Sequence, residues 1–241
     1  MKSFCRQKKR LLLVAEPQHE AIILIVVKAV FADLPKGEVQ TKFSLEAVES
    51  KINVAWLTST QVSFCSKAFR TEFGDHPDVA ALTVLGGFLR NGFLHRTIRE
   101  QGGAYGGGAS FDGSTGSFRF YSYRDPRLTE TLADFDASIE WMLSESHTAD
   151  ALEEAILGVV GSMDKPGSPA GEAQSDFYVY LHGRSLAYRE AFRAKVLSVT
   201  IDQLQHVAKT YLTKENENTA VITSTSKRAE LEALGFDIQT L

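Results

Sequence analysis

The sequence predicts an α+β domain, in which a mostly antiparallel sheet is covered by helices packed on one side. Three observations lead to this prediction. Two β-rich runs adjoin within residues 52–70, a glycine-rich hairpin follows at residues 104–123, and amphipathic helical patterns dominate from residue 126 onward. Strands that precede a block of helices are typical of the α+β class, whereas regular alternation of strands and helices would predict a parallel sheet.

The composition is that of a folded globular domain. The chain has 241 residues, 44% of them hydrophobic and 23% charged, and its 26 basic and 30 acidic side chains give a net charge of −4. These values exclude a disordered, collagen-like or coiled-coil protein. The mild acidity argues against a nucleic-acid partner, because proteins that bind nucleic acid concentrate basic residues on one face.

The N-terminal segment predicts a strand over residues 11–15, a helix that ends near residue 34 and a polar linker over residues 36–50. A secretory signal is the less favoured interpretation, because the first apolar run is short and polar residues interrupt it. The next apolar run, residues 21–32, is shorter than the ~20 residues of a membrane-spanning helix. We therefore expect no membrane partner and a location in the cytoplasm or an organelle matrix.

Two strands are predicted over residues 52–58 and 61–70, and alternation in the second strand places Cys65, Lys67 and Phe69 on one face. The two cysteines of the chain, Cys5 and Cys65, lack the spacing of a zinc knuckle and cannot form a disulfide framework. We expect each to be a small buried or half-buried side chain.

A helix is predicted from residue 75 to residue 99, because Asp75-His76-Pro77 is a helix-start signal and apolar residues follow at three- and four-residue spacing. Gly86, Gly87 and Gly92 lie inside this pattern, where each glycine costs about 1 kcal/mol relative to alanine. We infer that another backbone packs closely against the helix.

A hairpin is predicted next, because seven of the 18 glycines fall between residues 102 and 116. Its strands are residues 104–111 and 117–123, and the residues between them have turn chemistry. Asp125 is predicted to be the N-cap of the following helix, with Pro126 in its first turn. Arg124 is interpreted as structural, holding Asp125 or a neighbouring loop.

The remaining predicted elements are helices over 128–142 and 152–163, a loop over 164–171, a helix opened by a capping box at Thr200–Gln203, a strand over 218–224 and a helix over 227–234.

Motifs for metal binding, nucleophilic catalysis and phosphate binding are absent from the sequence. None of the six histidines lies in H-E-x-x-H or H-x-x-E-H, no G-x-S-x-G elbow occurs, and the cluster at residues 102–108 lacks the Walker lysine. That cluster also precedes a strand, whereas a phosphate loop must open a helix. Two interpretations of the glycines stay open: an extended peptide adds to this strand, or the glycines let a helix cross the sheet closely.

One segment resembles a known family. His76-Pro77-Asp78, the run from Leu94 to Gly107 (LHRTIREQGGAYGG) and Ser122-Tyr123-Arg124-Asp125-Pro126 occur in the order seen in the last domain of presequence protease-type metallopeptidases, of the pitrilysin/insulinase superfamily. The resemblance extends from about Val54 to the C-terminus and weakens after Gly171. It implies a pitrilysin/insulinase-type two-layer domain over residues 51–241. Residues 1–35 then resemble the final strand and helix of a preceding homologous domain, and residues 36–50 are the linker.

The resemblance also implies a role for two residues. In such enzymes, four homologous domains close around a peptide, and the metal-free last domain reaches across with an arginine and a tyrosine, which correspond here to Arg99 and Tyr105. Both would stabilise the oxyanion that forms at the scissile carbonyl. The structural alternative is that Arg99 ends a helix favourably and Tyr105 packs under the sheet. The residues expected to contact the peptide backbone are Gly103, Ala104, Gly106 and Gly107.

The zinc motif of the family lies in its first domain, and this chain has none. The resemblance therefore implies no metal in this chain, zinc in the complete enzyme, and no activity for these residues alone. We expect a fragment, a truncated product or one part of a split zinc metalloendopeptidase, with peptide substrates and an N-terminal zinc-bearing half as partners. Self-association through exposed apolar surface is also expected. The alternative function is a non-catalytic scaffold or interaction domain of the same superfamily.

Overall fold

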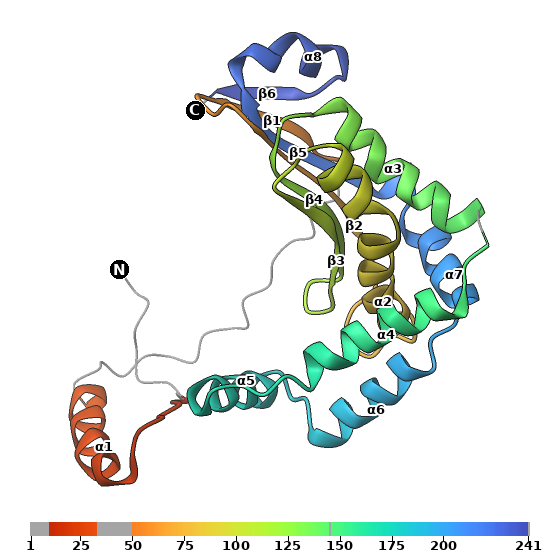
Figure 1. The fold of residues 1–241 in the computed structure, drawn as a ribbon. Helices are drawn as coiled ribbons and strands as arrows, with labels where there is room; N and C mark the ends of the chain where they lie inside the picture. Colours follow the sequence, from red (N-terminus) through yellow and green to blue (C-terminus); the bar gives the residue numbers. More distant parts are fainter. Residues whose placement is uncertain (1–9, 33–49, 145, 241) are drawn as a thin grey trace. The chain divides into compact units, whose positions relative to one another are not determined.

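The computed structural model describes residues 10–32, 50–144 and 146–240 (Figure 1). The chain divides into two compact units. The first unit combines residues 165–188 with the N-terminal segment, and the second contains residues 50–164 and 189–241. The predicted linker lies outside the described residues except for Ser50, and the predicted domain boundaries stay a prediction.

The first unit contains two helices, α1 (Pro17–Ala32) and α5 (Pro169–Leu181). Helix α1 confirms the predicted N-terminal helix, but the strand predicted over residues 11–15 is wrong. No described strand runs beside this segment to complete its hydrogen bonds, and its backbone is irregular. The loop predicted over residues 164–171 is shorter, because Ser168 caps α5 and Pro169 occupies its first turn. None of the described helices is long and apolar enough to cross a membrane.

The second unit is organised around a six-stranded sheet with the strand order β3-β4-β2-β5-β1-β6. Three of its five strand pairings are antiparallel, and the two pairings of β1, with β5 and with β6, are parallel. The sheet is therefore mixed, with its antiparallel part at the β3 end. The strand bounds are β1 Asn53–Thr58, β2 Ser63–Arg70, β3 Gly106–Asp112, β4 Ser117–Asp125, β5 Glu217–Ser224 and β6 Asp237–Thr240.

The helices of the second unit collect on one face of the sheet, as the sequence predicts (Figure 1). Thr200 and Gln203 form the predicted capping box, with each side chain bound to the other residue's backbone N–H. The long helices are α2 Val79–Leu89, η1 Arg90–Gln101, α3 Thr129–Ser144, α4 Ala149–Met163, α6 Leu186–Leu197, whose first three residues belong to the first unit, and α7 Ile201–Tyr211. The short helices are η2 Lys214–Asn216, η3 Thr225–Lys227 and α8 Arg228–Ala233.

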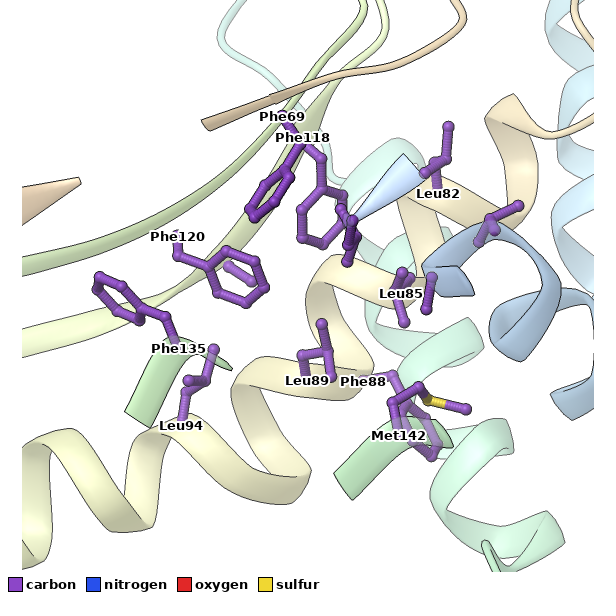
Figure 2. Close-up of a cluster of buried hydrophobic side chains, with 14 of the residues drawn as sticks. Phe69, Leu82, Leu85, Phe88, Leu89, Leu94, Phe118, Phe120, Phe135 and Met142 are labelled. Atoms are coloured by element: carbon purple, nitrogen blue, oxygen red, sulfur yellow. The ribbon is translucent and has the colours of Figure 1, made fainter. Parts of the chain in front are cut away.

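The hydrophobic core lies between this helical layer and the sheet (Figure 2). Strand β2 alternates as predicted, so Cys65, Lys67 and Phe69 face the helices and are buried. Burial raises the pKa of the Cys65 thiol to about 12, so this thiol stays protonated and is a poor nucleophile at neutral pH. The other face of the sheet carries half-exposed aromatic side chains, among them Tyr121 and Tyr123.

The close approach of another backbone, expected from the glycines of α2 and η1, is confirmed at one of the three, Gly86. A methyl group at Gly86 would lie 3.1 Å from the backbone of Ser110 in β3, and one at Gly92 would lie 2.5 Å from the Trp141 ring. Only the first of these neighbours is backbone. A methyl group at Gly87 would meet no atom within 4 Å, so packing does not explain that glycine.

Asp125 ends strand β4 and is completely buried, so its predicted role as the N-cap of the next helix is wrong. Helix α3 begins only at Thr129. The Asp125 carboxylate instead accepts hydrogen bonds from the Arg127 backbone N–H at 2.9 Å and from the Thr131 hydroxyl at 2.7 Å. The carboxylate therefore holds the turn that connects the strand to the helix.

The predicted β3–β4 hairpin is present, and Asp112 organises its turn. The Asp112 carboxylate accepts hydrogen bonds from the Ser114 hydroxyl at 2.6 Å and the Ser114 backbone N–H at 2.9 Å. The hydrogen bond from the Ser114 hydroxyl is the main reason that the pKa of Asp112 is lowered. Because the folded state favours the ionised carboxylate, this stabilisation is present above the unfolded-state pKa of about 3.9 and is lost as the pH falls below it.

We therefore expect the free energy of unfolding of an Asp112→Asn variant to fall less steeply than that of the unmodified chain between about pH 5 and pH 2.5. Urea unfolding at several pH values measures both slopes. Glu130→Gln, which removes an exposed carboxylate in the first turn of α3, is the matched control. If the slope changes no more in Asp112→Asn than in this control, the role assigned to Asp112 is incorrect.

Candidate functional site

The helix that carries Arg99 is wider than predicted. The sequence predicts one α-helix up to residue 99, but α2 passes into the π-helix η1 at Arg90. The local apolar spacing does not distinguish the two helix types, because Leu94 and Ile98 are four residues apart and both face the core. Stretches of π-helix are rare and occur often at functional sites.

A tight turn connects η1 to β3 and lies between Arg99 and Tyr105. Gly103 has a φ of +78°, a conformation that glycine adopts without strain. Its N–H donates to the Arg99 carbonyl at 3.1 Å, and the Ala104 N–H donates to the Ile98 carbonyl at 3.1 Å. The end of the helix and the start of the strand are therefore fixed to each other through the backbone.

Arg127 attaches the end of η1 to helix α3. Its Nη2 atom donates to the Thr97 carbonyl at 3.2 Å and to the Asp134 carboxylate at 2.9 Å. Gly102 lies against this guanidinium, which leaves no room for a methyl group at that position. The sequence does not reveal this role, since it depends on a carbonyl 30 residues away along the chain.

The Arg99 side chain is exposed and lies beside His95 and Glu100. Its Nη1 atom is 3.4 Å from His95 Nε2, and His95 Nδ1 is 3.3 Å from the Glu100 carboxylate. Because a guanidinium only donates hydrogen bonds, Nε2 must be the acceptor in this contact, which assigns the proton of a neutral His95 to Nδ1. Arg99 is thus held loosely at the surface, with most of its donors facing solvent.

Tyr105 begins the other side of the turn and is 70% exposed, so it does not pack under the sheet. Its backbone N–H donates to the Arg124 carbonyl at 3.3 Å. Its ring meets the Tyr123 ring edge to face, with centroids 5.7 Å apart, and Tyr123 in turn contacts Phe64 at 5.4 Å. These contacts orient the ring while leaving the side chain accessible to a ligand.

The glycines at the start of β3 have different surroundings. A methyl group at Gly107 would lie 2.7 Å from the Ile98 side chain of η1, so this glycine lets the helix cross the sheet closely. A methyl group at Gly106 would meet nothing within 4 Å. Ala104 is buried, which leaves only its backbone for a ligand, and Gly103 is exposed. Strand β3 pairs only with β4 among the described strands, so it is an edge of the sheet.

Arg124 lies in a bulge of β4 beside this site. The register of β4 against β2 shifts between the pairs Ser63–Asp125 and Cys65–Ser122, and Arg124 has a φ of +50°. Such a conformation costs a residue with a side chain about 1–2 kcal/mol. Strand propensities give no sign of it, so the sequence could not indicate that Arg124 differs from an ordinary strand residue.

No group of three or more His, Cys, Asp and Glu side chains lies close enough to hold a metal ion in the part of the chain that the structure describes. These residues therefore do not fit a zinc ion. The exposed hydrogen-bond donors at the site include the side chains of Arg99, Tyr105 and Arg124, and the exposed His95 and Glu100 lie beside Arg99.

Comparison with known proteins identifies the family. Residues 53–227 match the model of the family described as the PreP C-terminal domain. The chain belongs to this family. Its curated relatives include the mitochondrial presequence proteases of Danio rerio, 40% identical over 151 residues, and of Xenopus tropicalis, 39% identical over 157 residues. These matches cover 63% and 64% of this chain, but only 14% and 15% of the relatives. The chain therefore spans about one seventh of the length of these relatives.

Solved structures share the fold of this PreP C-terminal domain. A Helicobacter pylori protease has a TM-score of 0.66 at 16% identity, and the match covers 87% of this chain and 53% of the protease. Pitrilysin has a TM-score of 0.61 at 14% identity, with 93% of this chain and 25% of pitrilysin covered. The peptidase M16 inactive domain from Pseudomonas fluorescens has a TM-score of 0.64 at 21% identity, and the match covers 86% of this chain and 51% of that domain's chain. The α+β fold and the resemblance to presequence protease-type enzymes are thereby confirmed.

Proposed function

We propose that this chain is the C-terminal, metal-free part of a zinc metalloendopeptidase that degrades unstructured peptides, and that Arg99 and Tyr105 contact the peptide bond being cleaved. The observation that carries the proposal is the turn at Gly103, which fixes the backbone between the exposed Arg99 and Tyr105 in a chain of the presequence protease family. Because the chain spans about one seventh of its relatives, we infer that the metal belongs to another part of the complete enzyme.

In this proposal the two side chains stabilise negative charge on the carbonyl oxygen of the cleaved bond. The Arg99 guanidinium provides a positively charged fork of N–H donors, and the Tyr105 hydroxyl provides a neutral donor. Hydrogen bonds to that oxygen strengthen as its charge grows toward the transition state, so they accelerate the reaction more than they strengthen substrate binding. The contact between Arg99 and His95 is long enough, at 3.4 Å, to be exchanged for one with a peptide.

The proposed contact for the peptide backbone is the free edge of β3 at Gly106 and Gly107, together with Gly103 and Ala104 in the turn that precedes it. An extended peptide can add to an unpaired strand edge through main-chain hydrogen bonds, independently of its sequence. The open surroundings of Gly106 support this assignment, whereas Gly107 is already accounted for by its packing against η1. The two interpretations of the glycine cluster therefore apply to different glycines.

The partners of the chain follow from the same proposal. They are peptides and an N-terminal half that bears the zinc site, with neither nucleic acid nor membrane among them. The relatives are named as mitochondrial proteins, which favours the organelle matrix over the cytoplasm. Self-association stays a prediction, with the half-exposed aromatic side chains of the open sheet face as the surface for it.

The test is peptide turnover by the complete enzyme, that is, this chain together with the part that carries the zinc motif. We expect Arg99→Ala and Tyr105→Phe each to lower kcat by about 100-fold while KM and the melting temperature change little. The matched controls are Arg96→Ala, an exposed arginine on the same helix, and Tyr121→Phe, an exposed tyrosine on the open sheet face. Both controls should retain turnover within about twofold.

Three outcomes would overturn the proposal. Equal turnover of the Arg99 and Tyr105 variants and their controls would show that neither side chain acts on the peptide bond, and would favour the scaffold function. Loss of thermal stability in both variants with normal turnover would assign the two residues a structural role. Cleavage by the unmodified chain alone that a zinc chelator abolishes would show that the chain carries its own metal site.

A further inference from the structure

We propose that Arg124 is a specificity-determining residue that binds a carboxylate group of the peptide, an inference that rests on the proposed function. The backbone of Arg124 has a conformation that side-chain-bearing residues rarely adopt, with a φ of +50°. Arg124 is the only non-glycine residue with a positive φ in the described part of the chain. Strained residues of this kind persist where the surrounding structure holds them, and they cluster at ligand sites.

The bulge places the Arg124 side chain on the open face of the sheet, next to Tyr105. Asp125, the next residue, is completely buried on the opposite side. The Arg124 guanidinium carbon lies 5.6 Å from the centroid of the Tyr123 ring, which faces outward with Tyr105. The Arg124 carbonyl accepts the hydrogen bond from the Tyr105 N–H, so the backbone positions of these two residues are coupled. A bulge that re-aims a side chain is a common device beside binding sites.

No carboxylate of the described residues neutralises the charge of Arg124. Arg119, on the same strand, lies 3.9 Å from the Asp112 carboxylate, and Arg127 is paired with Asp134. Arg124 forms an ion pair with no carboxylate among the residues that the structure describes, and its guanidinium contacts only the face of an aromatic ring. Stacking on Tyr123 restricts the guanidinium while its outer N–H groups stay available.

A carboxylate is the ligand that this arrangement favours. The planar guanidinium presents paired N–H donors that match the two oxygens of a carboxylate, which a neutral amide cannot do. An extended peptide at the edge of β3 offers such a group from either of two sources, an acidic side chain or its own C-terminus. The preference should weaken at high ionic strength, because the pair is exposed to solvent.

The test measures the affinity of the full 241-residue chain for fluorescently labelled peptides by anisotropy. Both peptides of the first pair have an amidated C-terminus, and they carry either Glu or Gln at internal positions. The peptides of the second pair have no charged side chains, and they end in either a free or an amidated C-terminus. We expect the unmodified chain to bind the carboxylate-bearing member of at least one pair about fivefold more tightly, and the pair that responds identifies the source. Arg124→Asn should abolish this ratio, because asparagine tolerates a positive φ but carries no charge.

Arg119→Gln is the matched control, because it removes an exposed arginine from the same strand and lowers the net charge equally. This variant should keep the preference, and Arg124→Lys should keep only part of it, since an ammonium lacks the planar fork. Equal affinity of the unmodified chain for both members of each pair, or the same preference in Arg124→Asn, would overturn the role of Arg124 alone. If the unmodified chain binds none of the peptides, the proposed peptide contact fails, and the role of Arg124 fails with it.

Discussion

Replacing Phe120 with alanine is expected to lower the free energy of unfolding by about 4 kcal/mol. Phe120 lies on β4, is completely buried and faces the helical layer (Figure 2). Its ring contacts three other rings, those of Phe69, Phe118 and Phe135, with centroids 5.9, 5.4 and 5.5 Å away. Truncation removes the transfer free energy of the ring and leaves a cavity that these neighbours cannot fill without leaving their rotamers.

Chemical denaturation followed by circular dichroism measures this effect. Tyr121→Ala is the matched control, because Tyr121 is the next residue of β4 but points to the open face of the sheet. We expect the control to cost less than about 1 kcal/mol, since Tyr121 is 40% exposed. Similar losses in the two variants would mean that the two faces of the sheet are buried alike, contrary to the structure.

Replacing Lys67 with methionine is expected to lower the free energy of unfolding by about 3 kcal/mol, although methionine fits the site sterically. The Lys67 side chain is 4% exposed, and its Nζ atom lies 2.5 Å from the Asp136 carboxylate and 3.4 Å from the Glu217 carboxylate. These groups line a cavity of about 330 Å³ beside the sheet. Removing the cation leaves the carboxylates of Asp136 and Glu217 without a compensating charge, and breaking a buried ion pair in this way costs about 3–5 kcal/mol. Because both carboxylates are partly exposed, we expect a loss at the lower end of this range.

A second substitution separates charge from packing at this site. In Lys67→Met, the additional change Asp136→Asn should recover part of the stability, because it removes one of two carboxylates that no longer have a cation between them. In the unmodified chain, Asp136→Asn should instead be destabilising, because it breaks the pair. If Asp136→Asn has the same effect in both backgrounds, Lys67 and Asp136 are not coupled.

The sequence predicts most of the elements of the second unit, for physical reasons that are local. Alternation in β2 assigned Lys67 to the same face as Phe69, and Thr200 with Gln203 marked the start of α7. Strand β6 was missed, because its four residues are mostly polar and it is held by parallel pairing with β1. The strand predicted at residues 11–15 failed for the converse reason: a β-rich pattern forms a strand only where a partner strand completes its hydrogen bonds.

The residues of the candidate site likewise divide into those that a local sequence pattern indicates and those that depend on distant parts of the chain. Arg99 and Tyr105 were found in a local motif, and so were the glycines between them. The width of η1 could not be predicted, since α- and π-helices place Leu94 and Ile98 on the same side. The conformation of Arg124 depends on the pairing of β4 with β2, and the position of Arg127 depends on its contact with Thr97. Features that arise from long-range pairing leave little trace in the residues that adopt them.

The close contact of Gly107 with Ile98 has a consequence for the thermodynamics of binding. Because Gly107 has no side chain, the Ile98 side chain of η1 packs directly against the backbone of β3, which limits independent shifts of the strand and the helix, and the turn at Gly103 is held from both ends. The backbone entropy lost in setting the separation of Arg99 and Tyr105 is therefore incurred when the chain folds, before the proposed peptide binds. A ligand that meets this pair has only its own freedom and that of two side chains to lose, which is the thermodynamic advantage of a rigid scaffold.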